Sequence, residues 1–328
     1  MNQSDHASQD MSPVPQSDGV SRFVGGNEIP ENFRCGYVAI IGTPNVGKST
    51  LLNALLNQKI SIVTPKPQTT RHKVVGLLST TTYQIVFLDT PGIINPAYVL
   101  QEVMMESANS AINDADLVLL MIDAINPNVD SVGTQGGILA RVRHVKVPVV
   151  LIINKVDLVR KADILPIIDF YSKAFAFREI VPLSALTGDG TGELLKIVVG
   201  YLPLHPPFYP LDIVSEQSER FFVGEILREK VFLLCQEEVP YSTTVDVVDF
   251  KEGDRKKAFI SIDIIVERES QRGIIIGKKG IMLKKIGSIA RKEIEEFLQR
   301  PVFLDLRVKV REKWRRDKAW LQRRGYGV

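Results

Sequence analysis

Short apolar runs recur over the first two-thirds of the chain, separated by loops and helix-prone stretches. The runs occupy residues 36–41, 74–79, 83–88, 117–122, 147–153 and 179–183. Those at 117–122 and 147–153 are continuous and rich in β-branched residues, as is typical of strands buried on both faces of a parallel sheet. The runs at 74–79 and 83–88 flank a Thr-rich turn and predict a hairpin. A helix expected at 131–145 is weak because glycines interrupt it. The pattern predicts an α/β fold with a doubly wound, mostly parallel sheet.

A different order of elements follows in the last third. We expect a helix, two strands, a long helix and a final strand, at residues 218–237, 244–250, 258–266, 281–298 and 302–310. Strands and helices of this number suffice for a small α+β domain with its own core.

The chain of 328 residues is long enough for two domains. Four prolines within residues 203–210 predict a stiff, extended linker between them. The expected division is a disordered tail at 1–34, a larger domain at 35–202, a linker at 203–211 and a smaller domain at 212–328. The tail is polar, with two arginines against five acids, which argues against a mitochondrial transit peptide.

Composition narrows the class of protein. No apolar run is long enough to cross a bilayer. Cys35 and Cys235 are far apart and imply neither a disulfide framework nor a zinc site, so a reducing cytosol is expected. Residues 272–324 carry 17 bases and 6 acids, against 14 and 13 in residues 35–211. This basic block suggests a polyanionic partner, either nucleic acid or an anionic membrane surface, although charge alone favours a solvated lysine-rich face.

The first candidate site lies between the run at 36–41 and a helix-prone run at 51–56. It reads Gly42, Thr43, Pro44, Asn45, Val46, Gly47, Lys48, Ser49 and Thr50. A strand, a Gly-x-x-x-x-Gly-Lys-Ser loop and a helix in this order predict a phosphate-binding loop. The glycines let backbone N–H groups face a phosphate, and the helix N-terminus adds positive potential. Lys48 is expected to meet the β- and γ-phosphates, and the Ser49 hydroxyl to bind magnesium.

A polar segment follows at residues 59–76, where Pro65 and Pro67 exclude regular structure. Its centre holds Gln68, Thr69, Thr70, Arg71 and His72. The segment could be an ordinary surface loop. We favour a switch segment in which one threonine completes the magnesium shell when a γ-phosphate is present. The sequence leaves Thr69 and Thr70 as alternatives.

The run at 83–88 leads into Asp89, Thr90, Pro91, Gly92 and Ile93. A carboxylate at the carboxyl end of a central strand lies where doubly wound sheets bind ligands. We expect Asp89 to hold magnesium through water and the Gly92 N–H to approach the γ-phosphate. Ras-type GTPases place a glutamine at the position of Ile93 to orient water. An isoleucine cannot do this, so we expect slow intrinsic turnover.

Two later strands end in residues suited to a base. Asn154, Lys155, Val156 and Asp157 follow the run at 147–153, and Ser184, Ala185 and Leu186 follow the last one. Asp157 can accept hydrogen bonds from N1 and the 2-amino group of guanine, which adenine does not offer. Asn154 can reach the O6/N7 edge, the Lys155 stem can cover the ring, and the backbone at 184–186 can contact O6. These residues predict selectivity for guanine.

The smaller domain has its own glycine motif, Ile276, Gly277, Lys278, Lys279 and Gly280, before the long helix that contains Lys284. A Gly-x-x-Gly turn can be a mere tight helix start. With the order of elements and the basic excess, it indicates the RNA-binding loop of a KH domain. In the tail at 311–324 we expect Trp314 and Trp320 to pack on the smaller domain and some arginines to contact a polyanion.

Together, GTPNVGKST, QTTRH, DTPGI, NKVD, SAL and GKKG resemble the motifs of the Era family of bacterial GTPases. The resemblance covers about residues 35–326, and the single phosphate loop excludes relatives with tandem GTPase domains. It implies a P-loop GTPase domain followed by a type II KH domain. It also implies an enzyme that converts GTP to GDP and phosphate with magnesium, binds 16S ribosomal RNA near its 3′ end and assists maturation of the 30S subunit.

The resemblance implies further properties. Related potassium-stimulated GTPases hold the ion with an asparagine at the position of Asn45, so potassium is a candidate cofactor. A monomer is expected in the cytoplasm, with peripheral contact to the anionic inner membrane. We also expect GTP to order residues 68–72 and the segment after Gly92, and thereby to change how the KH domain sits.

Two rival interpretations belong to other classes. One is a plain RNA-binding module with a vestigial nucleotide pocket, against which the intact Lys48, Asp89 and Asp157 argue. The other is a membrane-associated signalling GTPase that couples growth or cell division to GTP. Vesicle sedimentation with competing ribosomal RNA would separate that interpretation from ours.

Overall fold

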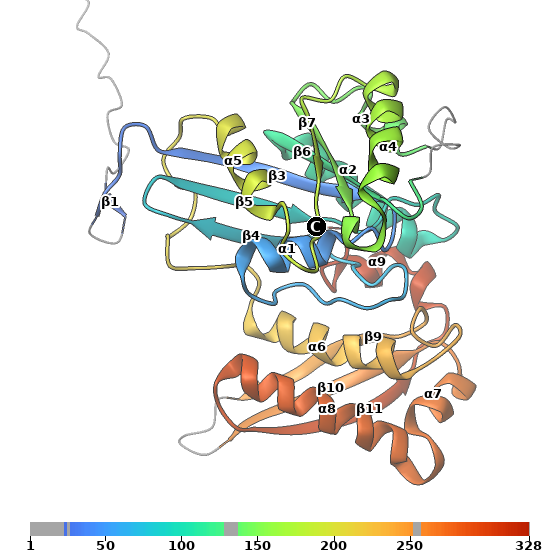
Figure 1. Ribbon diagram of the computed structural model, residues 1–328. Coiled ribbons are helices and arrows are strands. Elements are labelled where there is room, and N and C mark those ends of the chain that lie inside the picture. Colours follow the sequence, from blue (N-terminus) through green and yellow to red (C-terminus); the bar gives the residue numbers. More distant parts are fainter. Residues whose placement is uncertain (1–22, 25–26, 128–136, 252–256, 328) are drawn as a thin grey trace, which may run out of the picture.

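A computed structural model describes residues 23–24, 27–127, 137–251 and 257–327 (Figure 1). Most of the segment predicted as a disordered tail, and the first part of the weak helix expected at 131–145, lie outside the described residues. The described chain forms a larger unit around a six-stranded sheet and a smaller unit around a three-stranded sheet. None of its helices has the length and apolar character of a membrane span.

The larger sheet has the strand order β4-β5-β3-β6-β7-β8. Its strands are β3 (Arg34–Gly42), β4 (Val74–Ser79), β5 (Tyr83–Asp89), β6 (Leu117–Asp123), β7 (Val149–Asn154) and β8 (Glu179–Pro182). Only β4 runs antiparallel, paired with β5 as the predicted hairpin, and the remaining pairs are parallel. The sequence prediction of a mostly parallel sheet is therefore confirmed.

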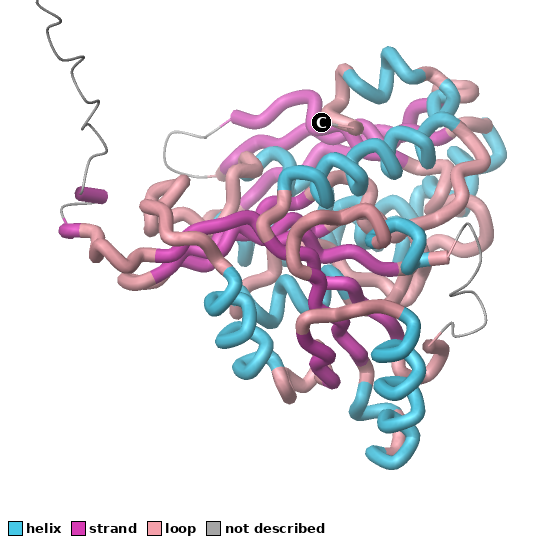
Figure 2. Tube along the Cα trace, turned by 90° about the horizontal axis from the view of Figure 1, so that it is seen from above, coloured by secondary structure: helices cyan, strands magenta, loops and turns pink. Residues whose placement is uncertain are grey.

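Helices cover both faces of this sheet (Figures 1 and 2). They are α1 (Lys48–Leu56), α2 (Val99–Asp114), α3 (Ile138–Val142), α4 (Lys161–Ala174) and α5 (Thr191–Tyr201), with a 3-10 turn η2 (Val156–Leu158). One core joins the sheet to α2, α3 and α4, and the other joins it to α1 and α5. The apolar runs are continuous because alternate residues of each strand face different cores: Ala39 and Ile41 face one, Val38 and Ile40 the other.

The smaller unit has the strand order β11-β10-β9, with β11 parallel and β9 antiparallel to β10. Its elements are α6 (Glu219–Leu234), β9 (Thr244–Lys251), β10 (Ala258–Val266), α7 (Glu269–Ile276), η3 (Lys278–Gly280), α8 (Ile281–Leu298) and β11 (Val302–Val310). Helix α7 was not predicted. In the sequence its three consecutive isoleucines form only an apolar run. In the structure they lie on different sides of the helix, since Ile274 is exposed and Ile275 is buried.

The proline-rich stretch is extended but it is not free. Pro203 O accepts a hydrogen bond from Cys35 N at 3.1 Å, and His205 N donates to Phe33 O at 3.1 Å. The Gln84 side chain then bonds both N and O of Tyr209. The stretch is thus fixed along the larger sheet. Phe33 is 2% exposed, so the end of the segment predicted as tail belongs to the folded unit. Further upstream, β1 (Phe23–Val24) pairs with β2 (Asn27–Glu28).

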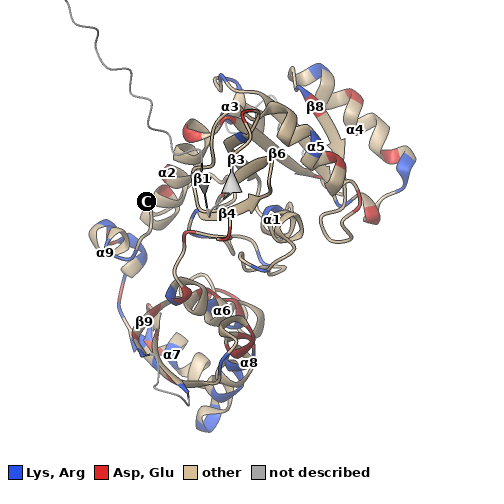
Figure 3. Ribbon diagram, turned by 90° about the vertical axis from the view of Figure 1, so that its left-hand side faces the viewer, with Lys and Arg blue, Asp and Glu red and all other residues tan. Residues whose placement is uncertain are grey.

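The carboxyl-terminal segment returns to the larger unit through η4 (Trp314–Arg316) and α9 (Lys318–Gln322). Trp314 and Trp320 are buried, but they cluster mainly with the apolar side of α2, including Leu100, Val103 and Met104. The prediction that both tryptophans pack on the smaller domain holds only in part: Trp314 Nε1 donates to Ser242 O at 3.0 Å and Ile265 of β10 joins the cluster, but most of its other members lie on α2. Helix α9 lies beside α2 between the two units (Figure 3), and α2 contributes apolar side chains to the cluster.

Candidate nucleotide-binding site and glycine loop

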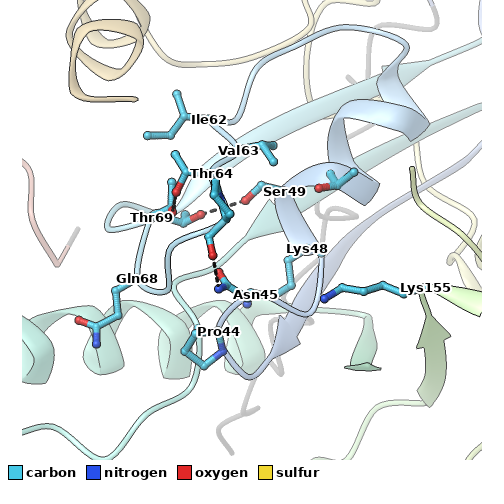
Figure 4. Close-up of a pocket in the computed structure, with 15 residues that line it drawn as sticks. Pro44, Asn45, Lys48, Ser49, Ile62, Val63, Thr64, Gln68, Thr69 and Lys155 are labelled. Carbon is cyan, nitrogen blue, oxygen red and sulfur yellow. Dashed lines mark hydrogen bonds between the residues drawn. The ribbon is translucent and has the colours of Figure 1, made fainter. Parts of the chain in front are cut away.

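A cavity of about 410 Å³ lies over the carboxyl end of β3, between the Gly42–Thr50 loop and the segment that follows α1 (Figure 4). Its lining includes Pro44, Asn45, Gly47, Lys48, Ser49, Thr50, Gln68, Thr69, Thr70, Gly92 and Lys155. Four of the motifs read from the sequence therefore contribute to one cavity, although they are far apart in the chain.

The two loop glycines are required by close approaches of other chain segments. Gly47 has φ 101°, and a Cβ there would lie 2.3 Å from Asn154 Nδ2. A Cβ on Gly42 would lie 2.6 Å from Met121 O. Larger residues would push the loop away from the sheet, so the glycines keep its backbone close to the strand ends.

Lys48 opens α1 and is 6% exposed. Its Nζ donates to Gly42 O at 3.2 Å and to Thr43 O at 3.1 Å, which curls the loop around the ammonium group. Burial lowers the pKa of Lys48 to about 8, and the nearby Asp89 opposes this shift. A buried ammonium group in this position is suited to an anionic ligand.

Asp89 is fully buried and joins several hydroxyls. Its Oδ2 accepts from Ser49 Oγ at 2.7 Å and from Ser61 Oγ at 2.9 Å, and Ser49 Oγ lies 2.9 Å from Thr70 Oγ1. Burial raises the pKa of Asp89, and its Oδ1 has no hydrogen-bond partner among the described residues.

These oxygens fit a magnesium ion. They are hard ligands, and one buried carboxylate oxygen is left over. The described chain contains no group of three or more His, Cys, Asp or Glu arranged for a metal. Magnesium suits such a sparse site because it keeps several waters and takes further ligands from a bound phosphate.

The two threonines of the candidate switch point in different directions. Thr69 Oγ1 lies 2.6 Å from Thr64 Oγ1 and donates to Lys66 O at 2.8 Å, so this hydroxyl serves the turn itself. Thr70 is the one that reaches Ser49. Of the two alternatives that the sequence left open, this contact favours Thr70.

The rest of the candidate switch contacts other elements. Gln68 Oε1 accepts from Gln101 Nε2 on α2 at 3.0 Å. Arg71 is 2% exposed, and its guanidinium donates to Thr243 O at 2.7 Å, Pro240 O at 3.0 Å and Tyr241 O at 3.1 Å in the smaller unit. The His72 ring lies 4.1 Å from the Tyr326 ring, centroid to centroid. These two residues are therefore inter-unit contacts, which their polarity alone did not indicate.

The segment after β5 lies directly under the phosphate loop. Thr90 Oγ1 donates to Ile40 O at 2.8 Å, and a Cβ on Gly92 would lie 2.8 Å from the Pro44 backbone. Ile93 N donates to Gly42 O at 2.9 Å, while its side chain is 7% exposed and packs in the core on the α2 side. Pro91, between Thr90 and Gly92, is also buried. The isoleucine side chain does not line the cavity.

Asn154 ties three loops together. Its Nδ2 donates to Val46 O at 2.7 Å and its Oδ1 accepts from Ala185 N at 2.9 Å. The carboxamide is thus engaged with protein, and it positions the phosphate loop and the 184–186 loop in addition to any contact with a base. Sequence reasoning assigned it only to the base, because its partners lie on other loops.

The other candidate base residues lie beside it. Lys155 has φ 66° and its Nζ lies 2.5 Å from Asp123 Oδ2, a partner that was not predicted. Asp157 is exposed in η2, which begins at Val156. Ser184 is buried, and Leu186 is 79% exposed. The carboxyl ends of β7 and β8 therefore bring these residues to the same edge of the sheet as the phosphate loop.

The glycine motif of the smaller unit is a sharp connection between α7 and α8. Gly277 has φ 69° and ψ 171°, and Gly280 has φ 76°. Between them Lys278 and Lys279 are exposed and form no ion pair within the described chain. Ile276 ends α7, and Lys284 is exposed in the first turn of α8. Three exposed lysines thus lie close to two glycines, which have no side chain to keep a ligand away from the backbone.

Two family models match the chain. Residues 37–155 match a family described as 50S ribosome-binding GTPase, and residues 238–315 match the KH domain. GTPase Era of Geotalea daltonii is 49% identical over 296 residues, which cover 90% of this chain and 99% of that protein. The chloroplastic GTPase ERA1 of Zea mays is 45% identical over 305 residues, covering 92% and 73%.

The chain belongs to the Era family of GTPases.

Solved structures of Era agree with this assignment. A tyrosine-to-alanine variant of Aquifex aeolicus Era, bound to GDP·AlF4⁻, superposes with a TM-score of 0.85 at 42% identity, covering 90% of this chain and 100% of that one. Era in complex with MgGDPNP and nucleotides 1506–1542 of 16S ribosomal RNA gives the same TM-score, identity and coverage. The predicted fold, a P-loop GTPase domain followed by a KH domain, is confirmed.

The basic tail of this Era-family chain is more neutralised than its composition suggested. Arg311 pairs with Asp317 at 2.9 Å, Arg315 with Glu267 at 2.5 Å, Lys318 with Glu106 at 2.8 Å and Arg324 with Asp246 at 2.7 Å. In the described part of the chain, Lys313, Arg316 and Arg323 form no ion pair. Only these three of the tail's bases are therefore free to meet a polyanion without losing an internal partner.

Proposed function

We propose that this Era-family GTPase is a GTP-dependent switch that binds 16S ribosomal RNA near its 3′ end and assists maturation of the 30S subunit. Hydrolysis of GTP to GDP and phosphate resets the switch. The RNA assignment rests on the exposed Gly277–Gly280 loop and on the Era complex with nucleotides 1506–1542.

We assign the nucleotide roles by position. Gly42, Gly47 and Lys48 would cradle the phosphates, and Gly92 would offer its N–H to the γ-phosphate. Asp157 would read guanine, Lys155 would cover its ring, and the 184–186 loop would meet O6. Buried Lys48 and the shared cavity support these roles.

Magnesium would be held by Ser49 and Thr70 directly and by Asp89 through water. Their hydroxyl and carboxylate oxygens already lie within hydrogen-bond distance of one another. When bound, the ion would neutralise charge that develops on the β- and γ-phosphates. Ile93 does not position the attacking water. Potassium held by Asn45 is a candidate for that role, and exposed Asn45 lies beside the cavity with its Nδ2 bonded to Pro65 O at 2.8 Å.

One observation carries the proposed coupling between nucleotide and RNA. Thr70 touches the candidate magnesium site, and the next residue, Arg71, is buried among carbonyls of the smaller unit. A change in the position of Thr70 therefore cannot leave Arg71 where it is without straining the backbone between them. Nucleotide state would thus alter how the KH unit is held.

The test is a comparison of RNA affinity between nucleotide states. We expect the full chain with Mg²⁺ and a non-hydrolysable GTP analogue to bind a 1506–1542 RNA more tightly than the GDP form. Equal affinities in the two states would contradict the coupling. A preference for ATP over GTP would contradict the assignment of the base site.

We further propose a monomer in the cytoplasm with peripheral contact to an anionic inner membrane. The free tail bases Lys313, Arg316 and Arg323 support the membrane contact, since exposed cations near the chain end attract anionic headgroups. Sedimentation with vesicles that contain anionic lipid tests it, and binding that ribosomal RNA fails to displace would favour the alternative of a membrane-associated signalling GTPase.

A further inference from the structure

A second cavity, of about 700 Å³, lies where the two units meet. The larger unit contributes Ala97 and Tyr98, just before α2. The smaller unit contributes the carboxyl ends of β10 and β11, the start of α7 and the η4 turn. The basic tail at 311–324 supplies part of this lining, and none of the glycine or nucleotide motifs contributes to it.

The charges around this cavity are unevenly satisfied. Glu267 is paired with Arg315, and Glu269 with Arg272 at 3.3 Å. Across the described residues, Arg268, Lys313 and Arg316 form no ion pair, and all three are exposed. Glu312 is the single lining carboxylate without a partner in that same part of the chain. The free charge that faces the cavity is therefore positive, which favours an anionic ligand.

The cavity also offers a flat surface. The Arg315 guanidinium lies 4.9 Å from the centroid of the half-buried Tyr98 ring. The Nε of Arg315 is buried and has no hydrogen-bond partner in the described chain. Aromatic rings and guanidinium planes are the groups on which proteins stack unpaired bases.

The position relative to the glycine loop is what connects these features to RNA. Helix α7 starts at the cavity with Glu269 and ends at Ile276, directly before the Gly277–Gly280 loop. Eight helical residues span about 12 Å, the length of a few nucleotides. Strand β11 is an edge strand, and α7 packs against it. RNA held at the glycine loop and lying along α7 and β11 would reach the cavity without a turn.

We propose that this junction cavity is a second RNA subsite. Arg268, Lys313 and Arg316 bind phosphates of nucleotides that flank those held by the glycine loop, and Tyr98 with Arg315 receives a base. The subsite rests on the proposed RNA binding of the KH unit. It adds that the GTPase unit itself touches the RNA, through Tyr98.

The test removes the three free cations together, as R268Q/K313Q/R316Q in the full chain. The matched control is K146Q/K161Q/R178Q, which removes the same charge from exposed positions of the larger unit that form no ion pair in the described structure. Two RNAs are compared: a four-nucleotide RNA, the length that a KH loop clamps, and the 1506–1542 segment. We expect the dissociation constant of the long RNA to rise at least about tenfold in the triple variant only. The slope of log K against log salt should fall by about 2, at roughly 0.7 per phosphate contact.

The four-nucleotide RNA should bind both triple variants alike. Photo-crosslinking of a 4-thiouridine-substituted long RNA should place an adduct on Tyr98. Equal affinities of the two triple variants for the long RNA, or the absence of any adduct near Tyr98, would overturn the subsite. The double variant K278E/K279E separates the two proposals. If it loses RNA while R268Q/K313Q/R316Q does not, the RNA function of the glycine loop stands and the junction subsite falls.

Discussion

Thr69 and Thr70 are neighbours in the chain, yet only Thr70 faces the candidate magnesium site. Replacing it by valine keeps the shape of the side chain and removes the hydroxyl that lies 2.9 Å from Ser49 Oγ. We expect Thr70→Val to lower the rate of GTP hydrolysis at least about tenfold, since even groups that only orient metal ligands cost that much. A magnesium titration of the hydrolysis rate should show a higher half-saturating concentration, while GDP affinity changes little.

Thr69→Val is the matched control for this experiment. Its hydroxyl bonds Thr64 and Lys66 within the turn, so its loss should lower the free energy of unfolding by about 1–2 kcal/mol and leave the magnesium dependence unchanged. A normal magnesium titration for Thr70→Val, or the reverse order of the two variants, would remove Thr70 from the metal site.

Ile93 occupies the position at which Ras-type GTPases use a glutamine, and its side chain is turned into the core. Ile93→Ala should therefore leave the rate of hydrolysis within about tenfold of the unchanged protein. The same substitution should lower the free energy of unfolding by about 2–5 kcal/mol, because it opens a cavity in a packed core. Urea unfolding and single-turnover hydrolysis at low temperature measure the two effects separately. A loss of several orders of magnitude in rate would show a direct role.

At this scale the sequence predicts residues whose role follows from a local motif. Lys48 lines the nucleotide cavity, and Asp89 accepts a hydrogen bond from Ser49, which also lines it, as the motifs predict. Asp123 and Ser61 were missed, and so was the positioning role of Asn154. Each acts through a partner brought close by strand order, as when β6 places Asp123 beside Lys155. Spacing along the chain carries no signal for such contacts.

The Gly277–Gly280 loop depends on each glycine for a different reason. A Cβ on Gly277 would lie 2.7 Å from Met282 Cβ, and its φ of 69° with ψ of 171° is a region that other residues rarely adopt. Apart from its two neighbours in the chain, no atom of the described residues lies within 4 Å of a Cβ on Gly280. The space beside Gly280 is open to a sugar-phosphate backbone, which is how a KH loop approaches RNA.

Gly280→Ala should therefore separate binding from stability. We expect RNA affinity to fall about tenfold or more, while the free energy of unfolding falls by only about 1–2 kcal/mol for the left-handed backbone. Gly273→Ala in α7 is the control, since it adds a methyl group in open space within a helix and should stabilise slightly. Filter binding with a short RNA and thermal unfolding give both quantities. Unchanged RNA affinity in Gly280→Ala would place the RNA elsewhere.

Among the elements, strands were predicted well whatever their length, whereas helices α2, α4, α5 and α7 were not predicted. Helix α8 and strands β9, β10 and β11 match their predicted ranges to within one residue. Helix α7 has only eight residues, and its isoleucines are consecutive, so they lack the spacing of three or four residues that predicts a helix. The tryptophans of the tail found their partners on α2, and a periodicity in the tail alone could not reveal a surface on another unit.

At the junction of the two units, lysines of residues 59–76 bind groups of the smaller unit. Lys66 Nζ donates to the carbonyls of Phe232 and Cys235 at the carboxyl end of α6, where the helix dipole favours a positive charge. Lys59 pairs with Glu229 at 2.8 Å and with Glu293 at 2.7 Å. The sequence suggested only a short linker as the connection between units. The structure instead shows that the segment bearing Thr70 is fastened to the KH unit.

This fastening predicts a specific result for Arg71→Gln. Glutamine is too short and has too few donors to satisfy the three carbonyls that the Arg71 guanidinium holds. Release of this anchor should leave GDP affinity unchanged, because Arg71 does not line the nucleotide cavity. The ratio of RNA affinities between the GTP-analogue and GDP forms should fall towards one. Fluorescence anisotropy of labelled RNA with each nucleotide measures that ratio.

Lys73→Gln makes the same charge change two residues away, where the side chain forms no ion pair or hydrogen bond in the described structure, and should keep the ratio. Loss of three buried hydrogen bonds could also loosen the fold, so Lys66→Gln provides a second, independent release of the same segment. If both variants keep the affinity ratio of the unchanged protein, the nucleotide must influence the KH unit through other contacts. The proximity of Thr70 to Arg71 then has no functional consequence. If both abolish it while GDP still binds, the KH unit acts as part of the GTPase switch, because it holds the loop on which magnesium depends.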